Sequence, residues 1–208
     1  MKITRFELGM LRVPLKTPFK TALRTVEAAE DVVLRIHTDT GHIGHGGAPA
    51  TAVITGDTHG GIVAAVRTCI APRLIGQEVA DLNRLCALVH TAMEHNTSAK
   101  AAVEIALYDL WAQLHGAPLY QLLGGGEPLI TTDITISVDD PEIMVADALA
   151  AIERGYTALK IKVGKDIGQD VQRVKAIHAA VHGRATLRLD ANQGWSAKQA
   201  VQAMHALE

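Results

Sequence analysis

The sequence predicts an α+β domain followed by parallel β/α units, and three observations carry that prediction. Short β-like runs separated by turn residues occupy residues 2–43, which is typical of an antiparallel meander. Three apolar stripes at helical spacing follow within residues 61–114. After Gly126 the pattern changes to alternating strands and helices, which favours parallel strands joined by right-handed crossovers. We therefore expect two domains, at residues 1–125 and 126–208.

The strands of the first domain are predicted from β-like runs at residues 2–13 and 32–37, continued from Ile43 after a short turn. Two loops rich in polar or small residues are expected between and after these strands, at residues 16–30 and 46–57. The first loop carries several Thr, Lys and Arg residues, and the second contains Gly, Pro and Thr.

The helices of the first domain are predicted at residues 61–70, 79–93 and 99–114, where apolar residues recur every three or four positions. The third stripe is the clearest because it continues without a break. Ser98 is the expected N-cap of this helix, and Gly116 is the expected stop.

Each strand of the second domain is followed by an apolar stripe at helical spacing. An Asp-Pro pair opens the first helix, and glycines end the first two. A Ser-x-x-Gln capping box opens the third helix. The expected strands lie at residues 132–138, 158–163 and 185–189, and the helices at residues 141–152, 171–181 and from Ser196 onward.

The composition is that of an ordinary globular protein, with 48% apolar and 20% charged residues among 208. A net charge of −2 offers no basic surface for nucleic acid, and no apolar run approaches the length of a membrane span. Cys69 and Cys86 lie in apolar helical stripes, which favours small core residues over a disulfide. We expect a cytoplasmic protein that binds neither nucleic acid nor membrane.

Two lysines one residue apart, Lys160 and Lys162, are followed 28 positions after Lys162 by Asp190. Side chains at i and i+2 of a strand share one face, so the two ammonium groups lie together. Neighbouring ammonium groups disfavour each other's charge, which lets one of them accept a proton near neutral pH. An acid at the matching end of the next strand is placed to hold a metal ion. This pattern indicates a site that removes a proton from carbon beside a carboxylate.

A Lys-x-Lys pair on a strand is also typical of the solvated face of a sheet. Here the alternate positions are Leu159, Ile161 and Val163, which indicate a strand whose other face packs under helices. In a parallel α/β barrel the lysines then point inward, where charged groups are costly unless they have a function. The functional interpretation is therefore favoured.

Several motifs, in order along the whole chain, resemble the enolase superfamily, specifically its mandelate racemase/muconate lactonizing group. The helix Ser98-Ala99-Lys100-Ala101-Ala102-Val103-Glu104-Ile105-Ala106-Leu107-Tyr108-Asp109-Leu110, with Gly116, Pro118 and Leu122-Leu123-Gly124, is similar to that group's signature. Other segments resemble the dipeptide epimerases of the group: Pro18-Phe19-Lys20-Thr21-Ala22-Leu23-Arg24-Thr25, Ile54-Thr55-Gly56-Asp57, Thr135-Ile136-Ser137-Val138, Lys160-Ile161-Lys162-Val163-Gly164-Lys165 and Leu189-Asp190-Ala191-Asn192-Gln193-Gly194-Trp195.

The resemblance implies an α+β capping domain followed by the first three β/α units of a TIM-like (β/α)7β barrel. It further implies that Asp190 ligates Mg²⁺, which stabilises the enediolate formed when the substrate loses its α-proton. Lys162 would be the base on one face of the substrate, and Lys160 would face the developing negative charge. Asn192, two residues past the metal ligand, would be a polar group behind it that contributes to substrate binding.

Two further roles come from the same resemblance. Arg24 would pair with the side-chain carboxylate of a glutamate-containing dipeptide, since a guanidinium binds carboxylates through two hydrogen bonds. Thr135 would line the substrate pocket. On sequence alone, Arg24 is equally typical of a solvated basic loop, and Thr135 of an ordinary strand residue.

The resemblance implies epimerisation of dipeptides such as L-Ala-D/L-Glu, released in cell-wall turnover, by a protein that relatives suggest is a homo-oligomer. The group's other metal carboxylates and its opposite-face lysine lie on later strands. We therefore expect the 208 residues to be the inactive front portion of a longer protein. A muconate-type cycloisomerase, an o-succinylbenzoate synthase and a non-catalytic truncated fragment remain alternatives.

Overall fold

The computed structural model describes residues 1–21, 24–126 and 129–208. It divides into two compact units, each with its own apolar core. The first unit comprises Met1–Pro14 with Ala28–Pro128, and the second comprises Leu15–Glu27 with Leu129–Glu208. Residues 15–27 thus belong with the second unit, whereas the sequence indicates two uninterrupted domains.

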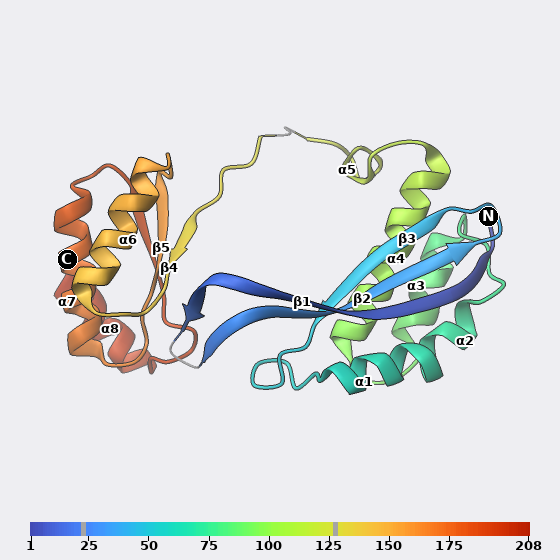
Figure 1. Ribbon diagram of the computed structural model, residues 1–208, viewed down its shortest axis with the longest axis horizontal. Helices are drawn as coiled ribbons and strands as arrows, with labels where there is room; N and C mark the ends of the chain where they lie inside the picture. Colours follow the sequence, from blue (N-terminus) through green and yellow to red (C-terminus); the bar gives the residue numbers. More distant parts are fainter. Residues whose placement is uncertain (22–23, 127–128) are drawn as a thin grey trace. The chain divides into compact units, whose positions relative to one another are not determined.

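The chain begins with a three-stranded sheet in the order β1-β2-β3 (Figure 1). Its strands are β1 (Ile3–Lys20), β2 (Thr25–Thr38) and β3 (Ile43–Pro49). β2 and β3 pair antiparallel, from Asp31 opposite Pro49 to His37 opposite Ile43. This pairing confirms the antiparallel part of the predicted meander.

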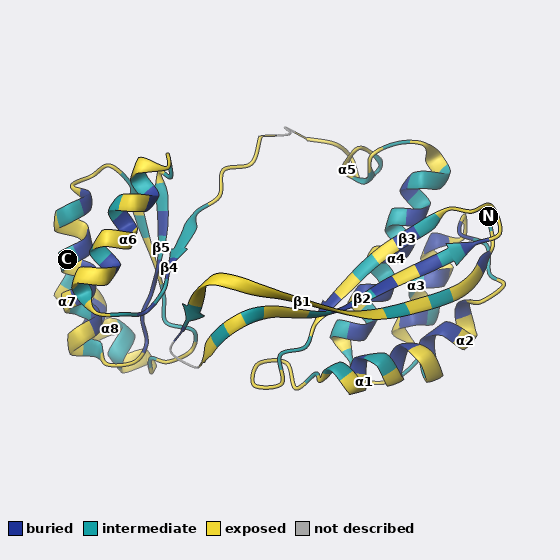
Figure 2. Cartoon of the chain, in the orientation of Figure 1, coloured by how far each residue is buried: buried dark blue, intermediate teal, exposed yellow. Residues whose placement is uncertain are grey.

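Strand structure extends into two segments that the sequence wrongly predicts as loops. β1 continues to Lys20 and β2 begins at Thr25, within the predicted loop at residues 16–30, and β3 continues to Pro49. Most residues of β1 and of the first half of β2 are exposed or half-buried (Figure 2). A strand with no buried face lacks the alternating apolar pattern from which strands are predicted, so this extension leaves little trace in the sequence.

The helices of the first unit begin with a continuous helical stretch, in which α1 (His59–Ala64), η1 (Ala65–Ile70) and α2 (Ala71–Leu74) follow one another. The η1 segment has π-helical hydrogen bonding, a feature that the apolar stripe does not predict. The remaining helices are α3 (Leu82–His90), α4 (Thr97–His115) and the short, unpredicted α5 (Leu119–Leu122).

Of the two predicted ends of α4, the structure confirms one and contradicts the other. Gly116 ends the helix in the left-handed conformation, at φ 62°, which confirms the predicted stop. The predicted N-cap Ser98 is wrong, because the cap position is Asn96. The Ser98 hydroxyl instead donates a hydrogen bond to Asp57 Oδ2 at 2.5 Å.

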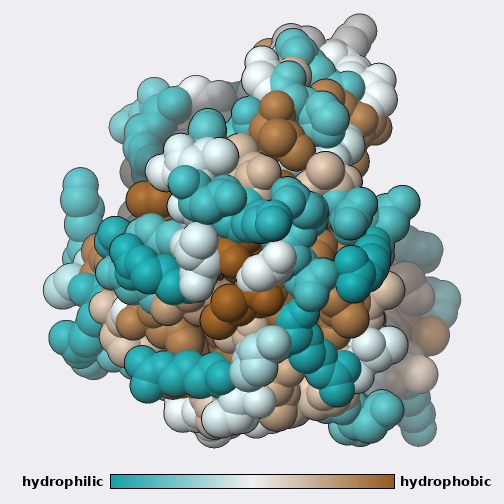
Figure 3. Space-filling view, turned by 90° about the vertical axis from the view of Figure 1, so that its right-hand side faces the viewer, coloured by the Kyte–Doolittle hydropathy of each residue, from teal (hydrophilic) through white to brown (hydrophobic). Residues whose placement is uncertain are grey.

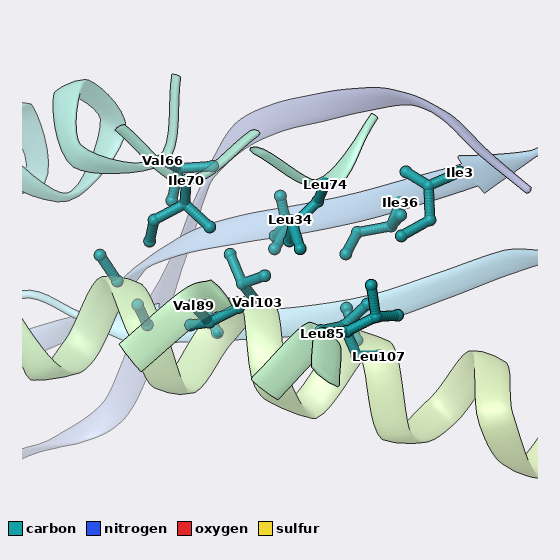
Figure 4. Close-up of a cluster of buried hydrophobic side chains, with 14 of the residues drawn as sticks. Ile3, Leu34, Ile36, Val66, Ile70, Leu74, Leu85, Val89, Val103 and Leu107 are labelled. Atoms are coloured by element: carbon teal, nitrogen blue, oxygen red, sulfur yellow. The ribbon is translucent and has the colours of Figure 1, made fainter. Parts of the chain in front are cut away.

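The core of the first unit lies between the sheet and its helices (Figure 4). Leu34 and Ile36 of β2 and Val103 and Leu107 of α4 are fully buried there. α4 lies directly against β3, since a Cβ on Gly46 would come within 1.9 Å of the Ala102 carbonyl oxygen. Only glycine therefore fits at this contact.

The second unit contains a parallel sheet in the order β4-β5-β6, which confirms the predicted parallel pairing. The capping box that opens α8, formed by Ser196 and Gln199, is also confirmed. The elements of this unit are β4 (Ile134–Ile136), α6 (Pro141–Glu153), β5 (Ala158–Lys162), α7 (Ile167–Val181), β6 (Thr186–Asp190) and α8 (Ala197–Leu207).

The two faces of this sheet differ in character, as the alternation of residues in β5 predicts. Leu159 and Ile161 are fully buried and pack in one apolar cluster with Met144 of α6 and Ile177 of α7. Since successive side chains of a strand alternate between faces, the intervening Lys160 belongs to the opposite face. That face carries the polar residues of the candidate site.

One surface of the first unit is mixed in polarity. Figure 3 shows apolar side chains gathered between polar ones on the face turned to the viewer. Tyr120 and Leu123, beside α4, are 51% and 63% exposed.

No helix among the described residues combines the length and apolar character needed to cross a membrane.

Candidate active site

The register of the parallel sheet aligns the polar residues of β4, β5 and β6. Lys160 pairs with Thr135 of β4 on one side and with Arg188 of β6 on the other. Two residues further along, Lys162 pairs with Asp190. Residues paired in register on neighbouring strands point to the same face, so these five side chains share one face of the sheet.

Asp190 lies at the centre of this group. Its Oδ2 accepts a hydrogen bond from Lys162 Nζ at 2.7 Å, and Lys160 Nζ lies 2.9 Å from the same oxygen. Lys162 is only 5% exposed, whereas the side chain of Lys160 is 34% exposed. The structure therefore brings the two predicted lysines and the predicted acid together.

The charge of Asp190 is fixed by its surroundings. Hydrogen bonds from Lys162 and then from Lys160 hold the pKa of the Asp190 carboxyl well below its usual range. The backbone N–H of Asn192 also donates to Asp190 Oδ1 at 2.9 Å, which favours the ionised form further. The carboxylate is thus ionised at neutral pH.

Asn192 has an uncommon environment. Its backbone lies in the left-handed region at φ 48°, as does that of Gln193 at φ 63°. The Oδ1 atom of Asn192 is buried and has no hydrogen-bond partner among the described residues. An unpaired buried acceptor costs free energy, so this oxygen marks a place where a donor or a cation would be favourable.

The residues present fit part of a Mg²⁺ site. Asp190 and Asn192 offer oxygen atoms, the ligand type that Mg²⁺ prefers, but a near-octahedral ion needs about six. Within residues 1–21, 24–126 and 129–208, no three or more His, Cys, Asp or Glu side chains gather where they could hold a metal. These two oxygens would therefore contribute to an ion whose other ligands come from elsewhere.

Residues 15–27 attach to the end of β4. The backbone N–H of Val138 donates to the Lys20 carbonyl at 3.3 Å, and the Lys20 ammonium pairs with Asp139. This attachment places the Phe19 ring with its centroid 5.9 Å from Lys162 Nζ, a cation–π contact. No sequence pattern distinguishes Phe19 as a site residue, although it lies in the segment Pro18-Phe19-Lys20-Thr21-Ala22-Leu23-Arg24-Thr25.

Arg24 and Thr135 are placed differently with respect to the lysines. Thr135 pairs in register with Lys160, and it lines a pocket of about 310 Å³ together with Phe19. Arg24 is exposed, and its backbone N–H donates to Thr21 Oγ1 at 3.2 Å. Ala22 and Leu23, which belong to the same motif, lie outside the described residues.

Sequence reasoning missed a second charged pair on this face. Arg188 NH1 lies 2.8 Å from Asp133 Oδ2. Arg188 is in register with Lys160, and Asp133 lies two positions before Thr135. The spacing of Arg188 two positions before Asp190 was the available signal, because it puts both side chains on one face. The polar face is therefore longer than the lysine pair alone indicates.

The fold and this cluster define a class of protein: an α+β domain followed by parallel β/α units with paired lysines and a carboxylate at the strand ends. Comparison with known families gives the family itself. The chain belongs to the mandelate racemase/muconate lactonizing enzyme family, whose N-terminal domain matches residues 5–124. An enolase C-terminal domain-like region matches residues 144–208.

Several relatives are similar over the whole chain. The L-Ala-D/L-Glu epimerase of Bacillus subtilis is 49% identical over 209 residues, which span 100% of this chain and 57% of the relative. Its substrate-liganded structure superposes with a TM-score of 0.96 over 99% of this chain and 57% of that one. A dipeptide epimerase from Enterococcus faecalis, complexed with Mg and the dipeptide L-Leu-L-Tyr, is 38% identical with a TM-score of 0.95, over 100% and 58% of the two chains.

A muconate lactonizing enzyme from Mycobacterium smegmatis, complexed with muconolactone, is also similar. It is 32% identical with a TM-score of 0.94, over 100% of this chain and 57% of that one. The chain thus spans less than two thirds of the length of the relatives it matches.

Proposed function

We propose that this chain supplies the proton-abstracting side of a Mg²⁺-dependent dipeptide epimerase, an isomerase acting on substrates such as L-Ala-D/L-Glu. The observation that carries the proposal is the convergence of Lys160 and Lys162 on the Asp190 carboxylate, at 2.9 and 2.7 Å. The similarity to the B. subtilis epimerase, at 49% identity, supports the choice of a dipeptide.

Asp190 would hold part of the oxygen shell of Mg²⁺, and the buried, unpartnered amide oxygen of Asn192, two residues further along the chain, would be a second candidate ligand. When bound, such an ion supplies positive charge that favours the build-up of negative charge on a substrate carboxylate. Lys160 Nζ, which is more exposed than Lys162, would donate to that carboxylate as its charge grows.

Lys162 would act as the base. In its neutral form its Nζ takes the proton from the α-carbon, and the electron pair of the broken C–H bond moves into the adjacent carboxylate. Burial of Lys162 and the Phe19 ring next to it keep water away from the Nζ atom. Epimerisation also needs a proton returned on the opposite face, by an acid group that we expect on later strands.

The substrate contacts belong to the same proposal. Arg24 would pair with the glutamate side chain, and Thr135, which is in register with Lys160, would line the substrate pocket. We also propose that, along the sequence, the boundary between the family's two domains falls between residues 125 and 126. We also propose that the protein is cytoplasmic, that it processes cell-wall peptides and that it forms a homo-oligomer. The apolar side chains exposed on the first unit support the last of these proposals.

The test is an epimerisation assay on the product of the complete gene, called the complete protein below. L-Ala-L-Glu is incubated with and without Mg²⁺, and formation of L-Ala-D-Glu is followed by NMR. We expect turnover that needs Mg²⁺, and none from the 208-residue chain alone. Absence of Mg²⁺-dependent turnover of any Ala-Glu isomer by the complete protein would refute the proposal.

A muconate-type cycloisomerase is the second candidate, because the M. smegmatis muconate lactonizing enzyme is similar over the whole chain. The same lysine pair would serve that reaction, so the pair by itself does not distinguish the two functions. Assaying the complete protein with muconolactone in parallel separates them: conversion of muconolactone without dipeptide turnover would favour this candidate.

A further inference from the structure

Two charged side chains on α7, those of Asp170 and Arg173, are almost fully buried, at 1% and 7% exposure. Arg173 NH1 lies 3.0 Å from Asp170 Oδ1. Burying such a pair is costly unless further hydrogen bonds satisfy both groups. Neither residue belongs to the lysine–aspartate cluster, so the partners of these two groups show what the pair does.

The second oxygen of Asp170 joins two loops. Oδ2 accepts a hydrogen bond from the backbone N–H of Gly164 at 2.7 Å and another from Trp195 Nε1 at 3.1 Å. Gly164 lies two residues after Lys162, and Trp195 lies five residues after Asp190. One carboxylate oxygen therefore links the segments that follow β5 and β6, immediately beyond the candidate catalytic residues.

Arg173 extends the link to a third segment. Its Nε donates to the backbone carbonyl of Asp139 at 2.8 Å, just after β4, while NH2 donates to Gln169 Oε1 at 3.1 Å. The pair thus contacts the segments that follow all three strands of the parallel sheet. Hydrogen bonds to charged groups are among the stronger ones, so these contacts restrain the segments effectively.

Two of these segments also touch each other through their backbones. A Cβ on Gly164, at φ 111°, would come within 2.3 Å of the Ala191 carbonyl oxygen, and one on Gly194 within 2.2 Å of the Gly164 carbonyl oxygen. Gly164 therefore cannot move toward Ala191 without displacing it. The next residue, Asn192, donates its backbone N–H to Asp190 Oδ1.

We propose that Asp170 is a positioning residue, which with Arg173 fixes the segments after β4, β5 and β6 and so sets the arrangement of Lys162, Asp190 and Asn192. The effect on catalysis rests on the function proposed above. The effect on the geometry does not, since it follows from the contacts of Asp170 alone.

The first test is hydrogen–deuterium exchange of the Asp170→Asn variant of the complete protein, followed by mass spectrometry. An asparagine side chain has only one accepting oxygen. If that oxygen accepts from Gly164 and Trp195, the NH2 group is left facing the Arg173 guanidinium, and both of these groups are donors. We expect faster exchange at Gly164 and at Asn192, with exchange in the middle of β5 unchanged. Unchanged exchange at Asn192 would overturn the proposal, since the segment after β6 would then hold its position without Asp170.

The second readout is kinetic. We expect kcat on the dipeptide to fall roughly 10–100-fold in Asp170→Asn, as for other residues that orient a metal site from behind, with little change in KM. A rise in KM of the same size, without a fall in kcat, would contradict a positioning role. If the wild-type protein turns over no dipeptide, the proposed function fails, and the exchange experiment still decides the inference.

Two further variants complete the test, one that removes a single hydrogen-bond donor and one that serves as a control. Trp195→Phe removes only the indole donor, and we expect faster exchange at Asn192 but not at Gly164; the reverse pattern contradicts the linkage. Asp81→Asn is the matched control, because Asp81 forms the same i,i+3 pair with Arg84 on an exposed surface of the first unit. It should leave exchange at Gly164 and the value of kcat unchanged.

Discussion

The Nζ atom of Lys162 lies 2.7 Å from Oδ2 of Asp190, although the two residues are 28 positions apart in the sequence. β5 and β6 pair in register at these two residues, and the backbone N–H of Val163 donates to the Asp190 carbonyl at 3.1 Å. The pair is therefore held at both the side-chain and the backbone level. It is the contact on which the proposed chemistry depends.

Replacing Lys162 by Arg tests the base directly. A guanidinium keeps the positive charge and can still donate to Asp190, but it does not lose its proton in proteins. In the complete protein we expect turnover to fall roughly 10²–10⁴-fold, the usual contribution of a general base. Lys165→Arg, on the exposed segment just after β5, is the control and should retain activity.

The low pKa of Asp190 makes the stability of the second unit depend on pH. Because this carboxyl has a lower pKa in the folded state, its stabilising effect is present above the unfolded value of about 3.9 and is lost as pH falls below it. The difference in free energy of unfolding between wild type and Asp190→Asn should therefore shrink between about pH 6 and about pH 3. Urea titrations at both pH values measure it; a constant difference would disprove the linkage.

Much of the parallel unit was predictable because its signals are local. Leu159 and Ile161 alternate with the lysines, and this alternation alone predicts which face is buried. The network around Asp170 could not be predicted in this way, since its partners include the backbone groups of Gly164 and Asp139. Backbone donors and acceptors exist at nearly every residue, so a sequence pattern does not reveal which of them a buried carboxylate will meet.

Arg24→Met tests the proposed contact with the glutamate side chain. Loss of a guanidinium that pairs with a carboxylate should raise KM for L-Ala-L-Glu while leaving turnover of a dipeptide without an acidic side chain unchanged. Steady-state kinetics of the complete protein on both substrates give the answer. Arg12→Met is the control, since Arg12 pairs with Glu30 in the first unit and should affect neither substrate. Equal KM values for wild type and Arg24→Met would remove Arg24 from the site.

The close approach of two backbones after β5 and β6 predicts opposite effects for two glycines. Gly164→Ala would force a Cβ to within 2.3 Å of the Ala191 carbonyl oxygen at a positive φ, so we expect a loss of roughly 1–3 kcal/mol in the free energy of unfolding. Gly168→Ala, in the first turn of α7, has ordinary contacts and should stabilise by about 0.4–1 kcal/mol. Thermal unfolding of both variants measures the difference. Equal stabilities would show that the contact at Gly164 yields readily.

Arg24 illustrates what the sequence could not provide about the site. The register of β4 and β5 places Thr135 beside Lys160, whereas the position of Arg24 depends on how residues 15–27 attach to the end of β4. That attachment uses Lys20 and Asp139, which are 119 residues apart and carry no shared pattern. Contacts of this kind depend on the completed tertiary structure rather than on local propensity.

The most direct measurement is exchange of the substrate α-proton with solvent. The complete protein is incubated in D₂O with Mg²⁺ and each isomer of the Ala-Glu dipeptide, and deuterium at the glutamate α-carbon is followed by NMR. We expect incorporation from both isomers by the wild type, and loss of incorporation from one isomer in Lys162→Ala. Incorporation from both isomers at the wild-type rate in Lys162→Ala would contradict the assignment of Lys162 as the base.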